Sequence, residues 1–467
     1  MKQREGECQS SLSRSQFITN KTMTLKLGQW LSAQCRRKDS VGLLARYWVE
    51  EAHANRASDC ETWLDALKSD AKWQDAISSA SVEYAISVDC LKQGKVSPTF
   101  RRAFASPEHD KLLHESASYH RQHPEISPEI HLFQKHLGLA KAIEGRTLIY
   151  LDTCHWIHLR HVLLNSTQAL PVYKKILHVI DQLARNKRVL FPVSFPLFIE
   201  LLKQSDEKTR LATARLMNGL SGGVCFQFPL EIQRTELRQQ SLRAILREKA
   251  PDLISEVWTK VGYIGGELLP YNESLPKEDM CFMQKLWIDS MWAISLEHFV
   301  EFFDRSKMPA PFEEKLAAAT NSDAEWYRAN KLPFSEVLQR EKAHQLRGLL
   351  KEMEKIVQEV WDAYPNLRDV SKLPKPSADA ATPWALPSIQ VLGSINAALI
   401  TGAKKFSAND MLDFQHAALA VPYCDALFCD GPMAHVLQNK PLEFGKIYET
   451  TILSKPDDIL DYLQSLS

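Results

Sequence analysis

The stretch TLIYLDTCHWIHL, residues 147–159, decides the fold class. Its apolar run from Thr147 to Leu151 has the length of a strand and is too short for an independent helix. Other apolar runs of strand length lie at residues 189–193, 224–228, 426–429 and 448–453. Segments with helical periodicity lie between them, at residues 155–164, 172–184, 387–399 and 410–420. This alternation predicts an α/β domain with a parallel sheet and helices on both faces.

The composition is that of an ordinary folded protein. The chain has 467 residues, of which 45% are hydrophobic and 24% charged, so two or three domains are expected. Lys plus Arg and Asp plus Glu number 57 each, so any nucleic-acid binding must use local basic patches. The odd number of cysteines, nine without a CxxC pair, favours a reduced, cytoplasmic compartment. Because no apolar run reaches about 18 residues and no signal peptide is evident, neither membrane insertion nor secretion is expected.

The periodicity divides the chain into four parts. Residues 1–23 are polar and aperiodic and predict a flexible tail. Residues 24–95 predict a small all-α domain of short amphipathic helices. Residues 96–145, rich in proline and histidine, predict a polar linker with short helices whose histidines lie on the solvated surface. Residues 146–467 predict the α/β domain, interrupted by a helical insertion at about residues 231–380.

Five acids are the candidates for chemistry. Asp152 and Asp430 each follow an apolar strand, and the carboxyl ends of parallel strands share one rim, where ligands of open α/β sheets bind. Glu200 lies in an otherwise apolar helix, where a lone carboxylate is costly. Asp410 and Asp413 are spaced i,i+3 on one helix face, although Asp410 also suits a first-turn residue that complements the helix dipole.

Carboxylates that converge in this way repel one another, and their pKa values rise unless a hard cation neutralises them. Ligation by oxygen alone favours Mg²⁺ or Mn²⁺ over zinc. The sequence therefore predicts a divalent-ion site, with unrelated turn aspartates as the alternative interpretation.

Four segments of the α/β region resemble, in order, the motifs of PIN-domain nucleases. They read IYLDTCHWIHL (149–159), FPVSFPLFIELLK (191–203), NDMLDFQHAALA (409–420) and YCDALFCDGPMAHVL (423–437). The resemblance covers residues 146–230 and 385–455. This chain has Cys429 where the family has threonine, and its second and third motifs are unusually far apart.

The resemblance implies a metal-dependent endonuclease. Asp152, Glu200, Asp413 and Asp430 would hold one or two divalent ions, with Asp410 as an auxiliary ligand. The ions would bind the scissile phosphate and activate a water for in-line attack, leaving a 5′-phosphate. No histidine or lysine is nominated as a general base. RNA is preferred over DNA as the substrate because the family usually cuts RNA.

Two further groups of side chains are candidates for binding. Lys404, Lys405 and Arg160 are candidates for positioning phosphates, although each also fits plain surface. The competing metal set is Cys154, His155, His158 and His161. Its imidazoles are spaced three residues apart and so drift around the helix, which disfavours convergence on one zinc ion.

The N-terminal stretch LGQWLSAQCRRKDSVGLLARYWVEE, residues 27–51, resembles a small YozE-like, sterile-alpha-motif-like helical domain. The resemblance extends over about residues 25–91. Its motif residues are Asp39, Val41, Gly42, Leu44 and Ala45. The resemblance implies an interaction module that binds a protein partner.

The prediction is therefore a cytoplasmic nuclease whose substrate is nucleic acid, with RNA preferred over DNA. Pairing a nuclease-like domain with a small adaptor suggests the hypothesis of a toxin or defence effector, and a homo-oligomer is compatible with it. The alternative is a non-catalytic PIN-like scaffold that binds protein or nucleic-acid partners. A metal-dependent phosphatase or a flap-type DNA nuclease on a related fold is a third candidate.

Overall fold

The protein is seen here in a computed structural model that divides the chain into two compact units. One unit comprises residues 1–103 with 272–276, and the other comprises residues 104–271 with 277–467. The structure describes residues 44–48, 60–67, 73, 107–246, 253–271, 275–302, 312–347, 349, 358, 386–402 and 405–466.

The described part of the N-terminal unit is a small aromatic core. A helical segment at residues 44–48 and helix α3 (Cys60–Leu67) contribute buried Leu44 and Leu64. The Tyr47 ring stacks on Trp73, with ring centroids 5.2 Å apart and nearly parallel planes. Most of the predicted N-terminal domain, including Asp39, Val41 and Gly42, lies outside the described residues.

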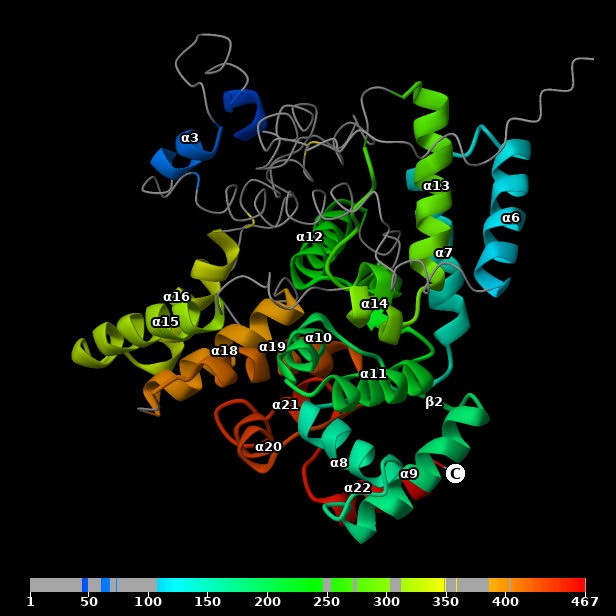
Figure 1. The fold of residues 1–467 in the computed structure, drawn as a ribbon. Helices are drawn as coiled ribbons and strands as arrows, with labels where there is room; N and C mark the ends of the chain where they lie inside the picture. Colours follow the sequence, from blue (N-terminus) through cyan, green and yellow to red (C-terminus); the bar gives the residue numbers. More distant parts are fainter. Residues whose placement is uncertain are drawn as a thin grey trace, which may run out of the picture. The chain divides into compact units, whose positions relative to one another are not determined.

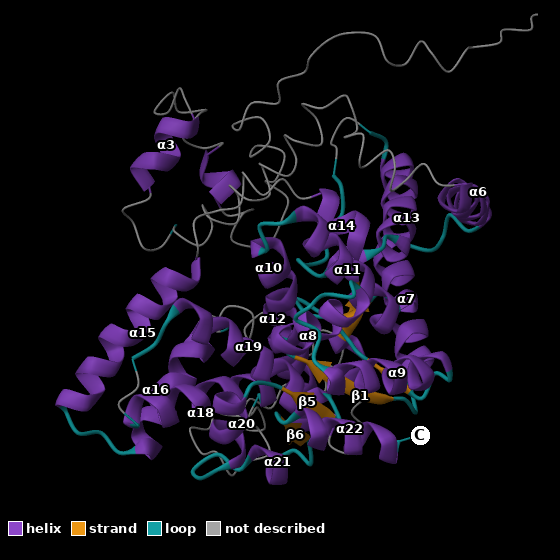
Figure 2. Cartoon of the chain, turned by 60° about the horizontal axis from the view of Figure 1, so that its bottom comes forward, coloured by secondary structure: helices purple, strands orange, loops and turns teal. Residues whose placement is uncertain are grey.

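A four-stranded parallel sheet forms the centre of the larger unit (Figure 2). Its strands, in spatial order, are β2 (Val189–Leu190), β1 (Thr147–Leu151), β5 (Ala426–Phe428) and β6 (Thr451–Leu453). β1 pairs in parallel with β2 and β5, and β5 pairs in parallel with β6. The described chain is thus mostly helical around a small parallel sheet, which agrees with the α/β prediction at that level.

Helices pack against this sheet and against one another. α9 contacts α8 and α22, and α19 contacts β5, α10 and α18. Tyr150 and Trp156 are fully buried in the shared core. The helices are α8 (Thr153–Leu163), α9 (Pro171–Arg185), α10 (Phe195–Lys203), α11 (Glu207–Ser221), α18 (Pro387–Thr401), α19 (Ala408–Tyr423), α20 (Gly431–Gln438), α21 (Phe444–Ile447) and α22 (Pro456–Ser465).

The region predicted to be a helical insertion also contains a strand. β3 (Val224–Phe226) pairs antiparallel with β4 (Trp258–Lys260) and contacts the chain just after β2 through one isolated parallel bridge, between Cys225 and Val193. β4 has only three residues, too few to show a strand periodicity in the sequence, and it forms because it pairs with the distant β3. The other elements are α12 (Pro229–Leu246), η2 (Ile254–Val257), η3 (Val261–Tyr263), α13 (Lys277–Ala293), α14 (Leu296–Phe302), α15 (Phe312–Ala329) and α16 (Phe334–Arg347).

The stretch predicted to be a polar linker instead contains two long helices. α6 (Pro107–Gln122) and α7 (Pro128–Ile143) have sixteen residues each and pack against α13 (Figure 1). Their prolines stand at the first helical position, where the missing N–H has no intrahelical partner to lose, so they begin the helices rather than break them. The predicted solvated surface is also wrong for His120, His131 and His136, which are buried.

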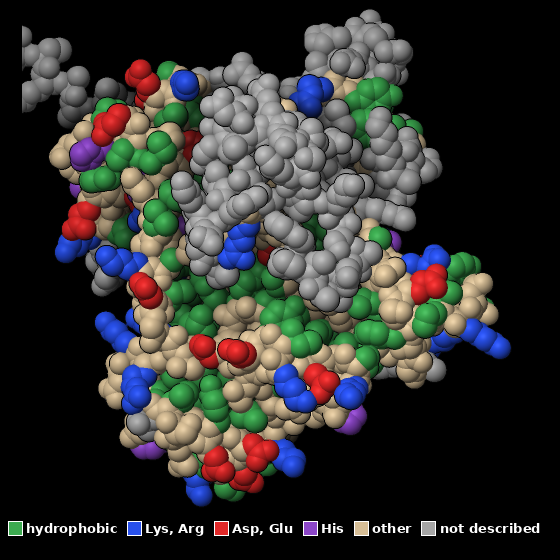
Figure 3. Space-filling view, turned by 180° about the vertical axis from the view of Figure 1, so that it is seen from behind, with side chains coloured by type: hydrophobic (Ala, Val, Ile, Leu, Met, Phe, Trp, Pro, Cys, Tyr) green, Lys and Arg blue, Asp and Glu red, His purple; other side chains and the backbone are tan. Residues whose placement is uncertain are grey.

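The outer surface agrees with the balanced composition. Figure 3 shows one face, on which acidic and basic side chains are interspersed over the coloured part. None of the described helices is both long enough and apolar enough to cross a membrane.

Candidate metal centre

Asp152 and Asp430 lie at equivalent places in the fold. Each is the N-cap of the helix that follows its strand, Asp152 for α8 after β1 and Asp430 for α20 after β5. Asp152 Oδ1 accepts a bond from the Thr153 N–H at 2.6 Å, and Asp430 Oδ1 accepts one from the Met433 N–H at 2.8 Å. The Asp152 N–H donates to the Phe428 carbonyl at 2.9 Å, so the two strand ends share one rim.

Glu200 reaches the same region from α10. Ser194 caps this helix, and Pro196 stands in its first turn. Glu200 Oε2 accepts a hydrogen bond from the Thr153 hydroxyl and another from His416 Nε2 at 3.1 Å. With its side chain 18% exposed, Glu200 gains its compensation from these donors rather than from water.

His416 is the site residue that the sequence analysis missed. It is buried on α19, and its Nδ1 lies 2.5 Å from the Tyr150 hydroxyl, which in turn lies 2.5 Å from Ser194 Oγ. Its position three residues after Asp413 places both side chains on one helix face, a signal that was available in the sequence.

His416 and Glu200 form a buried ion pair. Burial alone would lower the pKa of His416, but the bond to Glu200 and the charges of nearby carboxylates raise it overall. Burial alone would raise the pKa of Glu200, but the bond from His416 lowers it overall. Both directions favour the charged pair, in which His416 Nε2 donates to the Glu200 carboxylate.

Three ligand atoms, one each from Asp152, Glu200 and His416, lie within 4.8 Å of one another. Asp413 adds a fourth group, whose pKa rises to about 7 because of burial and the charge of Asp152, with smaller contributions from Glu200 and Asp430. Burial and Glu200 also raise the pKa of Asp152. Asp430 is exposed and stands outside the three-ligand group, although its charge reaches Asp413. Four of the predicted acids, Asp152, Glu200, Asp413 and Asp430, thus gather in one region, and two of them, Asp152 and Glu200, belong to the three-ligand group.

Asp410 has a local role at the start of α19. It forms a capping box with Ser407, accepting the Ser407 N–H at 2.7 Å and the Ser407 hydroxyl at 2.6 Å. Ser407 is therefore the N-cap, and Asp410 complements the helix start, as its alternative interpretation predicted. Lys405, upstream of this cap, is exposed, whereas Lys404 lies outside the described residues.

Arg160 does not have the surroundings expected of a phosphate-binding residue. It is buried, and its Nη1 donates to Gln204 Oε1 and Thr213 Oγ1, each at 3.3 Å. These bonds join α8 to the end of α10 and to α11. Its placement favours a packing role over a substrate contact.

The alternative zinc set on α8 is spread apart by its own partners. His155 Nδ1 lies 2.7 Å from the Tyr173 hydroxyl, and its Nε2 lies 3.3 Å from the Cys429 carbonyl. The His158 ring stacks on Tyr173, with centroids 4.6 Å apart. Cys154 instead donates from Sγ to Asp152 at 3.5 Å. The Cys154 sulfur and both His155 nitrogens are thus engaged by other groups, which disfavours a shared ion.

Comparisons of the chain with models of protein families, with curated proteins and with solved structures give no match. The functional argument therefore depends on the fold and on the geometry of this site.

Proposed function

We propose that the protein is a metal-dependent nuclease of PIN type that hydrolyses phosphodiester bonds, with RNA preferred over DNA. The observation that carries the proposal is Asp413 on α19, which is partly buried close to Glu200 and to Asp152, the acid that follows strand β1. Its pKa of about 7 reflects repulsion and desolvation that a divalent cation would relieve. Such an arrangement destabilises the metal-free protein and is typical of a functional site.

The donor set suits Mg²⁺ or Mn²⁺, because three carboxylates can supply oxygen ligands. When bound, such an ion supplies charge stabilisation for the phosphate and a more acidic water. Asp152 and Asp413 would hold the ion directly, and exposed Asp430 would complete the acidic rim. His416 keeps Glu200 ionised and orients it, and the Thr153 hydroxyl fixes the same carboxylate. Exposed Lys405 would contact the nucleic-acid backbone.

The wider proposals follow from the same nuclease. We propose that it acts in the cytoplasm, that the N-terminal helical unit binds a protein partner, and that the chain forms a homo-oligomer. A toxin or defence role is proposed on the pairing of the two units. Overexpression that leaves growth and cellular RNA intact would contradict that role.

The test is cleavage of a panel of single-stranded and structured RNA and DNA with Mg²⁺ or Mn²⁺. Wild type is compared with Asp152→Asn and Asp413→Asn. The matched control is Asp458→Asn, which changes an exposed acid in the first turn of α22. Cleavage by wild type and the control that is lost in both site variants supports the proposal. Equal cleavage by all four proteins points to a contaminating nuclease.

The second candidate is a non-catalytic scaffold, and the His416–Glu200 pair favours it. A protonated imidazole already neutralises one of the acids, which lessens the need for a metal ion. Thermal unfolding with and without Mn²⁺ separates the two candidates. A nuclease is stabilised by Mn²⁺ in a manner that depends on Asp152, whereas a scaffold shows no such stabilisation.

A further inference from the structure

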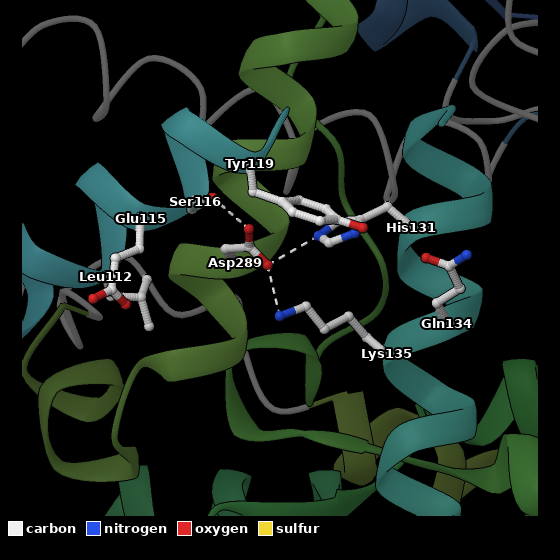
Figure 4. Close-up of a pocket in the computed structure, with 8 residues that line it drawn as sticks. All are labelled: Leu112, Glu115, Ser116, Tyr119, His131, Gln134, Lys135 and Asp289. Carbon is white, nitrogen blue, oxygen red and sulfur yellow. Dashed lines mark hydrogen bonds and ion pairs between the residues drawn. The ribbon is translucent and has the colours of Figure 1, made fainter. Parts of the chain in front are cut away.

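A second cluster of possible metal ligands lies where α6 and α7 pack against α13. His120 on α6, His131 on α7 and Asp289 on α13 are all buried, and one ligand atom from each lies within 4.8 Å of the other two. His120 Nε2 is 2.8 Å from Asp289 Oδ2, and His131 Nε2 is 2.9 Å from Asp289 Oδ1. Figure 4 shows His131 and Asp289 facing each other across the gap between their helices.

This cluster links α6 to α13. Among the α6 side chains that the structure describes, the buried ones are Ser116 and His120, and both donate to Asp289 Oδ2. Surface helices usually dock through an apolar stripe, and this one docks through polar groups on a buried carboxylate. Burial would raise the pKa of Asp289, but bonds from His131, Lys135 and Ser116 hold it well below its usual range. The carboxylate is therefore charged.

We propose that His120, His131 and Asp289 form a binding site for one divalent transition-metal ion of the zinc type. Two imidazole nitrogens and one carboxylate oxygen are ligands that Zn²⁺ prefers. Ligand atoms at about 2.0–2.1 Å from a tetrahedral ion lie roughly 3.3 Å apart. The two imidazole–carboxylate distances, 2.8 and 2.9 Å, are slightly shorter, so small outward shifts of the side chains open the site for an ion.

The orientation of the rings fits this role, because His120 and His131 both direct Nε2, a possible ligand atom, at Asp289. A metal-binding imidazole, here that of His120, must be neutral. Metal binding at Nε2 moves the ring proton to Nδ1, a buried atom without a hydrogen-bond partner among the described residues. Metal-bound histidines usually donate this second N–H to an acceptor. The lack of an acceptor for the His120 Nδ1–H weakens metal binding, so we expect an exchangeable ion rather than a permanent one.

Lys135 is the competitor for the ion. Its Nζ lies 2.7 Å from Asp289 Oδ1. Because the Lys135 side chain is 32% exposed, its ammonium can leave Asp289 and point into water. The cluster borders a pocket of about 430 Å³ that offers a path for the ion and room for a water as fourth ligand. Residues Leu112, Glu115, Tyr119 and Gln134 line the pocket beside the cluster (Figure 4).

The test is binding of Zn²⁺ by calorimetry and of Co²⁺ by visible absorption, using the full chain after treatment with a chelator. We expect one Co²⁺ with an absorption spectrum of nitrogen and oxygen ligation. His131→Ala should weaken binding about tenfold or more, whereas His114→Ala, which changes an exposed histidine of the neighbouring helix α6, should not. Asp152→Asn keeps the signal, which separates this site from the carboxylate site.

Lys135→Met guards the test against variants that lose binding because they misfold, since this substitution is expected to strengthen metal binding. Removing the competing ammonium should tighten Zn²⁺ binding several-fold. Zn²⁺ should also raise the melting temperature of wild type but not of His131→Ala. Absence of Zn²⁺ and Co²⁺ binding in both wild type and Lys135→Met, or a spectrum unchanged in His131→Ala, overturns the proposal and leaves the cluster as a polar link between helices.

Discussion

Asp413→Asn should stabilise the metal-free protein at alkaline pH. The folded state raises the pKa of Asp413 from 3.8 to about 7, first through burial and then through Asp152. The folded protein therefore binds this proton more tightly than the unfolded chain, and the stability of wild type falls as the pH rises from about 4 to about 7. A difference of about three pH units corresponds to about 4 kcal/mol at about 1.4 kcal/mol per unit. Partial exposure and relaxation reduce this, so we expect about 1–3 kcal/mol.

The assay is thermal unfolding of wild type and Asp413→Asn with EDTA, at several pH values between 5 and 8. The variant should melt higher by on the order of 2–4 °C at pH 8, and the gap should be smaller at pH 5, because it closes only near pH 4, where the carboxyl is protonated in the unfolded chain as well. Mn²⁺ should raise the melting temperature of wild type more than that of the variant. A variant that melts lower than wild type at pH 8 in EDTA would refute the argument, because Asp413 would then be a stabilising residue.

Three further predictions concern stability. His416→Gln should cost more stability at pH 6 than at pH 9. The folded state raises the pKa of His416, so the protonated ring stabilises the fold below the unfolded pKa, and this stabilisation is lost as the pH rises through the folded pKa. Urea unfolding at both pH values checks this. Tyr150→Phe removes a buried hydroxyl between two partners and should cost about 1–3 kcal/mol in the same assay. Gly262→Ala places a Cβ 2.1 Å from the Met291 carbonyl oxygen and should destabilise the fold by about 3 kcal/mol or more. Gly138→Ala on α7, where nothing lies within 4 Å, should instead be neutral or stabilising by up to about 1 kcal/mol, and equal effects of the two glycine changes would contradict this reading of the packing.

Features of the site that depend on nearby residues were predictable from the sequence. The runs TLIYL and ALF form adjacent parallel strands, and the acids after them cap helices, because strand length, capping residues and helix starts are all encoded within a few residues. Glu200 was also identifiable, because a carboxylate in an apolar helix needs a partner. The identity of that partner was not, since His416 is 216 residues away and the contact arises only when α10 and α19 pack.

The missed helices α6 and α7 have a different physical reason. Their polar composition suggested a linker because prolines and histidines are common in loops. On α6 the described buried side chains are Ser116 and His120, which pair with Asp289 from a helix more than 150 residues further along the chain; on α7, His131 makes the same pairing beside buried apolar residues. A sequence pattern that counts only apolar residues does not detect a helix whose docking face is polar.

The two clusters pair histidine with carboxylate in opposite proportions, and this difference separates their proposed metals. Near Asp152, one protonated histidine stands among several acids, two of which have raised pKa values, so the region retains excess negative charge. That surplus favours a hard divalent ion held by oxygen. At Asp289, two imidazoles and an ammonium already satisfy one carboxylate, so an ion gains there from nitrogen ligation more than from charge. Mg²⁺ should therefore distinguish the two sites by binding at the first and leaving Co²⁺ bound at the second.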